Sequence, residues 1–119
     1  MPRTLLIVDD HAGFRSSARA LLEAKGRLVV VGEAGTGTEA ITAVHRLRPD
    51  IVLLDIALPD IDGFAVCESI MAGENVQPIV VLTSSRSPAS YGSRLSASPA
   101  RGFIPKDELT AASLRALTG

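Results

Sequence analysis

The sequence predicts an α/β domain in which helices cover both faces of a parallel sheet. Five short aliphatic runs of strand length are spread along the chain, and segments with helical spacing of apolar residues separate them. Strands that alternate with helices form parallel sheets, because each crossover returns the chain to the same end of the sheet. At 119 residues we expect a single domain, residues 1–119.

The first half of the chain supplies three of the strands and two helices. The first helix should end at Gly26. The second should begin with the capping-box pattern of Thr36 and Glu39 and stop before Pro49. The three strands are Thr4–Val8, Leu28–Val31 and Asp50–Asp55. The residues expected on the inner faces of the two helices are Phe14, Ala18, Leu21, Leu22, Ala40, Ile41, Val44 and Leu47.

The second half adds two strands, a regular helix and two weaker elements. Residues 84–99 are rich in Ser and contain Gly92, with only Tyr91 and Leu95 as clear apolar anchors, so we expect a marginal helix. Asp107 is expected to cap a last helix. The strands are Ile79–Thr83 and Gly102–Ile104. The inward residues expected are Phe64, Cys67, Ile70 and Met71, before Gly73, and then Leu109, Ala116 and Leu117.

Right-handed crossovers leave few topologies for such a sheet. The two common candidates are the flavodoxin-like strand order 2-1-3-4-5 and a half-Rossmann arrangement. In both, ligands bind outside the carboxyl ends of the strands.

The composition excludes several classes of function. The net charge of −1 and the 3% aromatic content, without Trp, offer neither a basic face nor stacking platforms for nucleic acid. A single cysteine, Cys67, rules out an internal disulfide. We see neither a signal peptide nor an apolar run of the roughly 18 residues that a membrane span needs. We therefore expect a cytoplasmic protein.

Polar side chains stand at the carboxyl ends of four of the five strands. Asp9 and Asp10 follow the first strand, Asp55 ends the third, Thr83 ends the fourth, and Lys106 follows the fifth. Each residue alone has an ordinary structural explanation, such as a turn, a helix cap or a solvated charge. Their joint placement at adjacent strand ends makes a coincidence improbable.

This set of side chains suits phosphoryl chemistry. Three clustered carboxylates repel one another unless a cation lies among them. Mg²⁺ prefers oxygen ligands, keeps several waters, and is typically held by one or two carboxylates; Mn²⁺ suits the same ligands. A lysine and a hydroxyl can hold phosphoryl oxygens, and a carboxylate between them is equipped to act as a nucleophile that forms an aspartyl phosphate.

The chain resembles the receiver domain of response regulators in bacterial two-component signalling. The resemblance covers the whole chain, and its motifs are highly specific in combination. The segments that carry it are Leu6–His11, Leu53–Gly63, Val81–Ser84 and Gly102–Lys106. It implies the flavodoxin-like strand order and a phosphorelay switch. Catalysis would be limited to slow Mg²⁺-dependent self-phosphorylation and autodephosphorylation.

The resemblance also implies a role for each site residue. Asp55 would accept a phosphoryl group from a histidine kinase or phosphotransfer protein. Asp10, Asp55 and the backbone carbonyl of Ala57 would bind Mg²⁺, and Asp9 would hold the metal through water. Two residues would contact the phosphoryl group, and an aromatic residue would turn inward as the switch. The phosphoryl contacts would be Thr83 and Lys106. The switch aromatic would be Phe103, and Thr83 would also be part of the switch.

The chain departs from the family pattern near its output face. Many members carry a proline after the lysine, whereas here Pro105 precedes Lys106 and Asp107 follows it. Ser98-Pro99 stands where a Gly-Ala pair is common. These departures concern the face through which the family usually signals rather than the phosphorylation site.

One rival interpretation is an NAD-binding enzyme domain. Gly35–Ala40 matches the G-x-G-x-x-G/A fingerprint between a strand and a helix, and Asp55 lies the expected distance beyond it. The fingerprint normally follows the first strand rather than the second, however, and this interpretation leaves Asp9, Asp10, Thr83 and Lys106 unexplained.

A second alternative keeps the receiver but makes it the input half of a DNA-binding helix-turn-helix regulator. The sequence of the last helix resembles receivers of that kind. We favour a stand-alone receiver, monomeric or weakly dimeric, whose protein partner binds the face formed by the fourth helix, fifth strand and fifth helix. No nucleic acid or membrane partner is expected for this chain alone.

Overall fold

A computed structural model describes residues 2–73 and 76–119. Its five strands form one all-parallel sheet in the order β2-β1-β3-β4-β5, which confirms the flavodoxin-like topology. Strand β2 extends to Ala34, three residues beyond the predicted end, and the register between β1 and β2 shifts once, at Leu5 and Leu6. The strands are β1 Arg3–Val8, β2 Leu28–Ala34, β3 Ile51–Asp55, β4 Ile79–Ser84 and β5 Gly102–Pro105.

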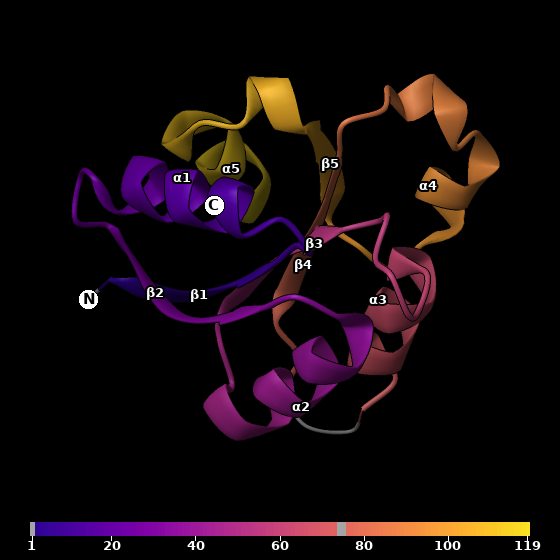
Figure 1. Cartoon of the computed structure of the whole chain (residues 1–119), viewed down its shortest axis with the longest axis horizontal. Coiled ribbons are helices and arrows are strands. Elements are labelled where there is room, and N and C mark those ends of the chain that lie inside the picture. The colour runs from indigo at the N-terminus through magenta and orange to yellow at the C-terminus, as the bar shows by residue number, and fades with distance from the viewer. Residues whose placement is uncertain (1, 74–75) are drawn as a thin grey trace.

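Helices cover both faces of the sheet, as Figure 1 shows, with α1 and α5 on one side and α2 and α3 on the other. Alternation along β1 divides the core between the two sides. Leu5 and Ile7 pack with α1 and α5, whereas Leu6 and Val8 pack with α2 and α3. The helices are α1 Ala12–Glu23, α2 Gly37–Leu47, α3 Gly63–Met71, α4 Ser93–Ala97 and α5 Ala111–Thr118. None of the described helices is long and apolar enough to cross a bilayer.

The central strand β3 is buried along its whole length, and Cys67 of α3 is a core residue as predicted. Two expectations for inward residues were wrong. Leu21 is 45% exposed because it lies beside, not on, the inward stripe that Ala18 and Leu22 occupy. In α5, Ala116 is exposed and Leu114 is fully buried in its place.

Two helix caps differ from the predicted ones. The Thr36 side chain accepts from the Glu39 backbone N–H, but the Glu39 carboxylate accepts from Gly35 rather than from Thr36, so only half of the capping box forms. Asp107 does not cap α5, because Lys106–Glu108 forms a separate 3₁₀ turn. Thr110 caps α5 through a reciprocal bond with Ser113, which places buried Leu109 before the helix rather than in it.

The segment between β4 and β5 forms only short helical turns, as its sequence predicts. It holds a 3₁₀ turn at Pro88–Ser90 and the five-residue α4, and neither contains a buried residue. Gly92 separates them with φ +56°, a conformation that favours glycine. Only Tyr91 and Leu95 reach the core from these turns.

Candidate functional site

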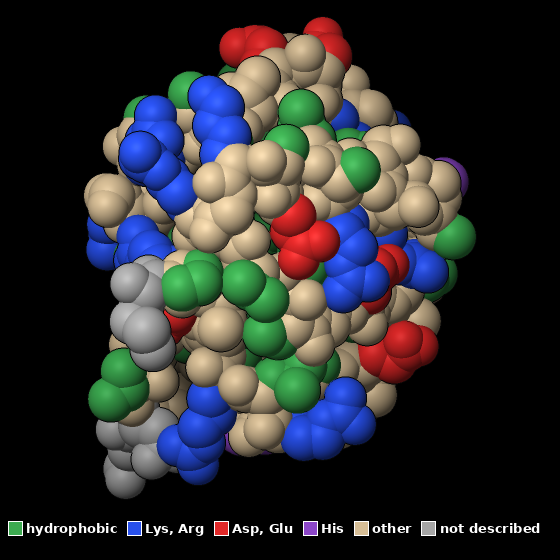
Figure 2. Space-filling model, turned by 90° about the vertical axis from the view of Figure 1, so that its left-hand side faces the viewer, with side chains coloured by type: hydrophobic (Ala, Val, Ile, Leu, Met, Phe, Trp, Pro, Cys, Tyr) green, Lys and Arg blue, Asp and Glu red, His purple; other side chains and the backbone are tan. Residues whose placement is uncertain are grey.

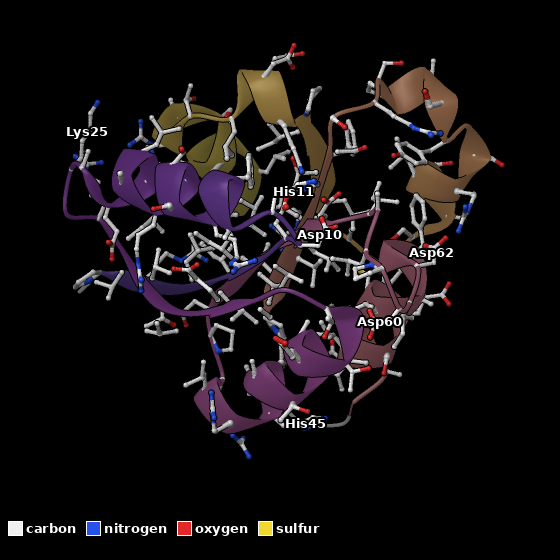
Figure 3. All side chains as sticks on the ribbon, in the orientation of Figure 1. Asp10, His11, Lys25, His45, Asp60 and Asp62 are labelled. Carbon is white, nitrogen blue, oxygen red and sulfur yellow. The ribbon has the colours of Figure 1, made fainter. Side chains whose placement is uncertain are left out.

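The carboxyl ends of β1, β3, β4 and β5 bring the predicted polar residues to one edge of the sheet. Asp55 pairs in register with Thr83, Thr83 pairs with Ile104, and Val8, just before Asp9, pairs with Leu54. Lys106 directly follows β5. Figure 3 shows Asp10 and the neighbouring His11 at this edge, where the chain leaves β1 for α1.

Lys106 joins two of the predicted carboxylates. Its Nζ lies 2.6 Å from Asp9 Oδ2 and 3.0 Å from Asp55 Oδ2. Both aspartate side chains are almost fully buried, and the lysine side chain is only 17% exposed. The same ammonium lies 4.6 Å from the centre of the Phe14 ring, a cation–π distance. The lysine charge is thus held in place by two acids and one aromatic face.

The proximity of these charges shifts their pKa values in different directions. Burial raises the pKa of Asp55, and the hydrogen bonds from Ala57 and Lys106 do not fully offset it. Burial also raises the pKa of Asp9, but bonds from Lys106 and the His11 backbone outweigh it, so that pKa is lowered overall. Burial alone lowers the pKa of Lys106, but the two carboxylates raise that pKa by more. The pKa of Lys106 is therefore above its ordinary value.

The acidic cluster at the end of β1 includes His11, to which the sequence analysis gave no function. Its Nδ1 lies 3.0 Å from Asp10 Oδ1 and 3.3 Å from Asp9 Oδ1, and its backbone N–H donates to Asp9 Oδ1 at 2.9 Å. Ligand atoms of Asp9, Asp10 and His11 all lie within 4.8 Å of one another. The only signal in the sequence was that His11 directly follows the two aspartates.

The loop after β3 holds Asp55 from the backbone. The Ala57 N–H donates to Asp55 Oδ1 at 3.0 Å, and the Ile56 N–H donates to the Thr83 carbonyl at 3.0 Å. Gly63 donates to the Ile56 carbonyl at 2.9 Å, and a Cβ built on Gly63 would lie 2.6 Å from the Asp55 carbonyl. The start of α3 is therefore packed directly against the backbone of Asp55.

Thr83 and Phe103 lie on neighbouring strands but make different contacts. The Thr83 hydroxyl donates to the Ile104 carbonyl at 2.7 Å, so its proton is engaged with β5. Phe103 is half-buried, with its ring centre 6.1 Å from that of Tyr91. The Tyr91 hydroxyl in turn lies 2.6 Å from Ser84 Oγ. The sequence does not predict this Ser84–Tyr91 contact, because a loop separates the two residues, which lie seven positions apart.

The donors at this edge fit a hard divalent cation. They are carboxylate oxygens, and Asp10, one-third exposed, can share a metal with water. Asp9 and Asp55 are already brought together by Lys106, so the carboxylates needed for such a site converge in the fold. The imidazole of His11 adds a nitrogen donor beside them.

Comparisons with known proteins identify the family. The chain matches the family model of the response regulator receiver domain over residues 5–117. A Pseudomonas aeruginosa protein described as a "Putative transcriptional regulator" is 38% identical over 104 residues, which are 87% of this chain and 49% of that protein. The DNA-binding response regulator MtrA of Mycobacterium tuberculosis is 43% identical over 83 residues, 70% of this chain and 35% of MtrA.

The fold comparison agrees with the sequence comparison. The signal receiver domain of NarL from Mycobacterium tuberculosis has a TM-score of 0.84 and 32% identity, over 99% of this chain and 98% of that one. The chain spans about half the length of the Pseudomonas relative and about a third of MtrA. The protein belongs to the response regulator receiver domain family of two-component signalling.

Proposed function

We propose that Asp55 is the phosphoacceptor of this receiver. The observation that supports the proposal best is the placement of Lys106 between Asp55 and Asp9, because it pairs a buried carboxylate with a cation able to hold a phosphoryl oxygen. An oxygen of the Asp55 carboxylate attacks the phosphorus of a phosphohistidine. The P–N bond breaks as the new P–O bond forms, and the bonding electrons leave with the imidazole, which takes up a proton.

The remaining site residues bind and position the phosphoryl group. Asp10, Asp55 and the carbonyl of Ala57 would hold Mg²⁺ or Mn²⁺, with Asp9 acting through water. The metal would supply positive charge for the oxygens of the transferring group. Lys106 holds one phosphoryl oxygen. Thr83 contacts the phosphoryl group as well, which requires its hydroxyl to leave the Ile104 carbonyl.

The same movement would start the switch. When Thr83 turns toward the phosphoryl group, it frees space beside β5, and Phe103 turns inward. Phe103 already contacts Tyr91, and Tyr91 contacts Ser84, the residue after Thr83. The α4–β5–α5 face would then present a different surface to a protein partner.

Mass spectrometry after incubation with acetyl phosphate and Mg²⁺ tests the phosphoacceptor. We expect one added phosphate in the wild type, none in Asp55→Ala, and one in Asp107→Asn, whose aspartate is exposed. An unchanged adduct in Asp55→Ala would show that Asp55 is not the phosphoacceptor. Loss of the adduct in both variants would point to a general effect of the substitutions rather than to this site.

The wider protein has two candidate roles. The first is a stand-alone receiver, a single domain over residues 1–119, that acts in the cytoplasm through a protein partner on the α4–β5–α5 face. The second is the input half of a DNA-binding regulator, and the relatives favour it, because MtrA is named as DNA-binding and is much longer than the matched region. Sequencing the gene beyond the codon for Gly119 separates the two.

A further inference from the structure

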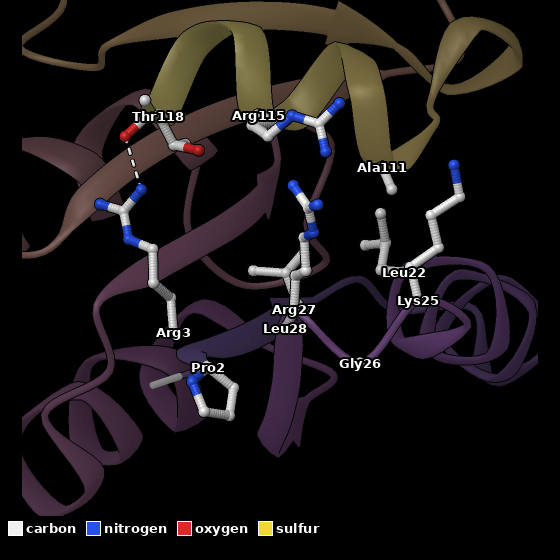
Figure 4. Close-up of a pocket in the computed structure, with 11 residues that line it drawn as sticks. Pro2, Arg3, Leu22, Lys25, Gly26, Arg27, Leu28, Ala111, Arg115 and Thr118 are labelled. Carbon is white, nitrogen blue, oxygen red and sulfur yellow. Dashed lines mark hydrogen bonds between the residues drawn. The ribbon is translucent and has the colours of Figure 1, made fainter.

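We call the group of Asp9, Asp10, Asp55, Thr83 and Lys106 the strand-end site. A cavity of about 440 Å³ lies at the opposite end of the sheet from it. It is formed where β1 and β2 begin, between the turn that joins α1 to β2 and helix α5 (Figure 4). We call it the basal cavity. Its volume falls in the range of small-molecule sites, roughly 300–1,000 Å³.

Cationic side chains surround the basal cavity. Arg3, Lys25, Arg27 and Arg115 come from three separate places in the chain, because Lys25 and Arg27 share the turn between α1 and β2. No acidic residue lines the cavity in the part of the chain that the structure describes. Arg3 Nη1 donates to the Thr118 carbonyl at 2.6 Å. Among the described residues, the other three form no ion pair.

The geometry concentrates this charge. Figure 4 shows the guanidinium groups of Arg27 and Arg115 pointing toward one another across the gap below α5, with the Lys25 ammonium directed to the same side. The chain as a whole carries a net charge of −1, so the concentration is local. Figure 2 shows Lys and Arg side chains around one face of the molecule, with hydrophobic and some acidic side chains between them. Like charges that face each other without a counter-ion are stabilised by a bound anion.

The floor of the cavity is apolar. Leu28 and Ala111 are half-buried and line the space beneath the cations, and Leu22 behind them is already almost fully buried by the protein. A simple inorganic anion would leave this floor uncovered. Arginine binds phosphate through two parallel hydrogen bonds and also stacks on planar rings. The combination matches a ligand with phosphate groups at one end and a flat, less polar body at the other.

We propose that the basal cavity binds an organic phosphate of nucleotide size. Arg27, Arg115 and Lys25 hold the phosphate groups, and the base and sugar cover Leu28 and Ala111. The site is separate from the aspartates at the carboxyl ends of the strands and independent of the function proposed for them. Binding joins the α1–β2 turn to α5, which belongs to the proposed output face.

Titration of the ¹⁵N-labelled full chain with ADP, in EDTA and moderate salt, tests this proposal by NMR. We expect saturable shifts in residues 22–28 and 111–118 and none at Asp9, Asp55 or Thr83. A double variant, Arg27→Gln with Arg115→Gln, should weaken binding at least tenfold. The control, Arg46→Gln with Arg86→Gln, removes the same charge from exposed positions elsewhere and should bind as the wild type does.

Equal weakening by the control pair would show that only the overall charge matters, and shifts centred on the strand-end residues would assign ADP to the other site. Either result overturns the proposal, as does an absence of saturation. Pyrophosphate, adenosine and a DNA duplex are the comparison ligands. Tighter binding of ADP than of all three supports a nucleotide site. Pyrophosphate that binds equally well, or DNA that binds more tightly, refutes it.

Discussion

Lys106 balances the charge of the strand-end site. Its ammonium is the cation that the structure places against both Asp9 and Asp55. Removing one partner from a buried ion pair costs about 3–5 kcal/mol, because the remaining charge is left without a partner in a medium of low polarity. A hydrophobic replacement should therefore expose the repulsion between the two carboxylates.

We expect Lys106→Met to be less stable than the wild type at pH 7 by about 3–5 kcal/mol. The lowered pKa of Asp9 means that its pairing stabilises the fold above the ordinary value of 3.8 and is lost as the pH falls through the lower folded value. The raised pKa of Lys106 means that its contribution is present below 10.5 and is lost as the pH rises through the higher folded value. Asp55, with its raised pKa, favours folding less once it ionises.

The difference in the free energy of unfolding between the wild type and Lys106→Met should therefore shrink as the pH falls from 7 toward 3, because the carboxylates of the variant become protonated. Urea unfolding at several pH values in EDTA measures it. Lys25→Met, which removes an exposed lysine, serves as the control and should change stability little at any pH. A deficit that does not depend on pH would mean that the lost packing of the lysine chain, rather than its charge, carries the effect.

Asp10 is the most accessible acid of the cluster, so metal binding should depend on it strongly. We expect Asp10→Ala to weaken Mg²⁺ binding by on the order of tenfold or more, or about 1.4 kcal/mol per factor of ten, and to remove phosphorylation by acetyl phosphate. Ala57→Ser should leave binding nearly unchanged, because the backbone carbonyl remains. Isothermal titration would refute the assignment if Asp10→Ala bound Mg²⁺ like the wild type.

Gly63 is the residue that allows α3 to approach the loop that follows Asp55. A Cβ at this position would lie 2.5 Å from the Ile56 Cα and 2.6 Å from the Asp55 carbonyl, and neither backbone atom can move without shifting the loop. We expect Gly63→Ala to cost about 1–3 kcal/mol, as overpacking does, and to slow phosphorylation.

Gly13→Ala is the matched control for this substitution. Gly13 lies in α1, and a Cβ there would meet no atom within 4 Å, so alanine should stabilise the helix by up to about 1 kcal/mol. Thermal unfolding of the two variants should thus shift in opposite directions. A neutral Gly63→Ala with normal phosphorylation would show that the loop relaxes easily.

At the scale of elements, the segment 84–99 differs from the rest of the fold in its short helices. Its longest helix has five residues, shorter than an isolated helix can sustain, and few apolar side chains compensate. Polar contacts hold its helical turns against the rest of the fold. They include Tyr91 with Ser84 at the end of β4, and Arg94 with Asp62 at 2.7 Å, where the guanidinium also covers the Phe64 ring. The Arg94–Asp62 ion pair is exposed, and exposed ion pairs contribute little to stability.

We expect this segment to exchange its amide protons faster than any other described part of the fold except the termini. A phosphoryl mimic at Asp55 should change its protection more than that of α1, α2 or α3, because it lies between Thr83 and Phe103. Hydrogen exchange with and without the mimic tests both statements. Slow exchange through Ala89–Ala97 in the free protein would show that the weak pattern in the sequence was misinterpreted.

Sequence patterns predicted elements well where a single local force decides them. The buried run of β3 and the break before Pro49 depend on burial and on proline geometry, and both appear as predicted. The cap of α5 was missed because Asp107 and Thr110 are both good caps, and the choice depends on where the chain leaves β5. Leu21 was misplaced because adjacent leucines are ambiguous in a helical pattern.

The site was predictable for a related reason. Strand ends in a parallel sheet converge, so Asp9, Asp55 and Lys106 could be placed together from topology alone. The contacts that topology does not determine were missed: His11 with the acids, and Tyr91 with Ser84. Both depend on side-chain conformations in loops.

At the scale of the whole molecule, the distribution of charge matters more than its total. The net charge is −1, yet carboxylates gather at one end of the sheet and arginines surround the basal cavity at the other. Binding of DNA depends on several phosphates being neutralised together, and affinity then falls steeply with salt. Lys25, Arg27 and Arg115 are exposed, but they form a small cluster on a chain whose net charge is −1.

We therefore expect no sequence-specific DNA binding by this chain, even though a relative such as MtrA is named as DNA-binding. The chain covers only about a third of MtrA, and the two arginines that lie on one face of α1, Arg15 and Arg19, are paired with Glu33. Gel shifts with the purified chain at low and moderate salt, against specific and random duplexes, measure this. The arginines of the basal cavity should cause only weak, nonspecific retention of DNA at low salt. This retention should disappear at moderate salt to the same extent for both duplexes. A sequence-specific shift that survives moderate salt would place recognition within the receiver itself.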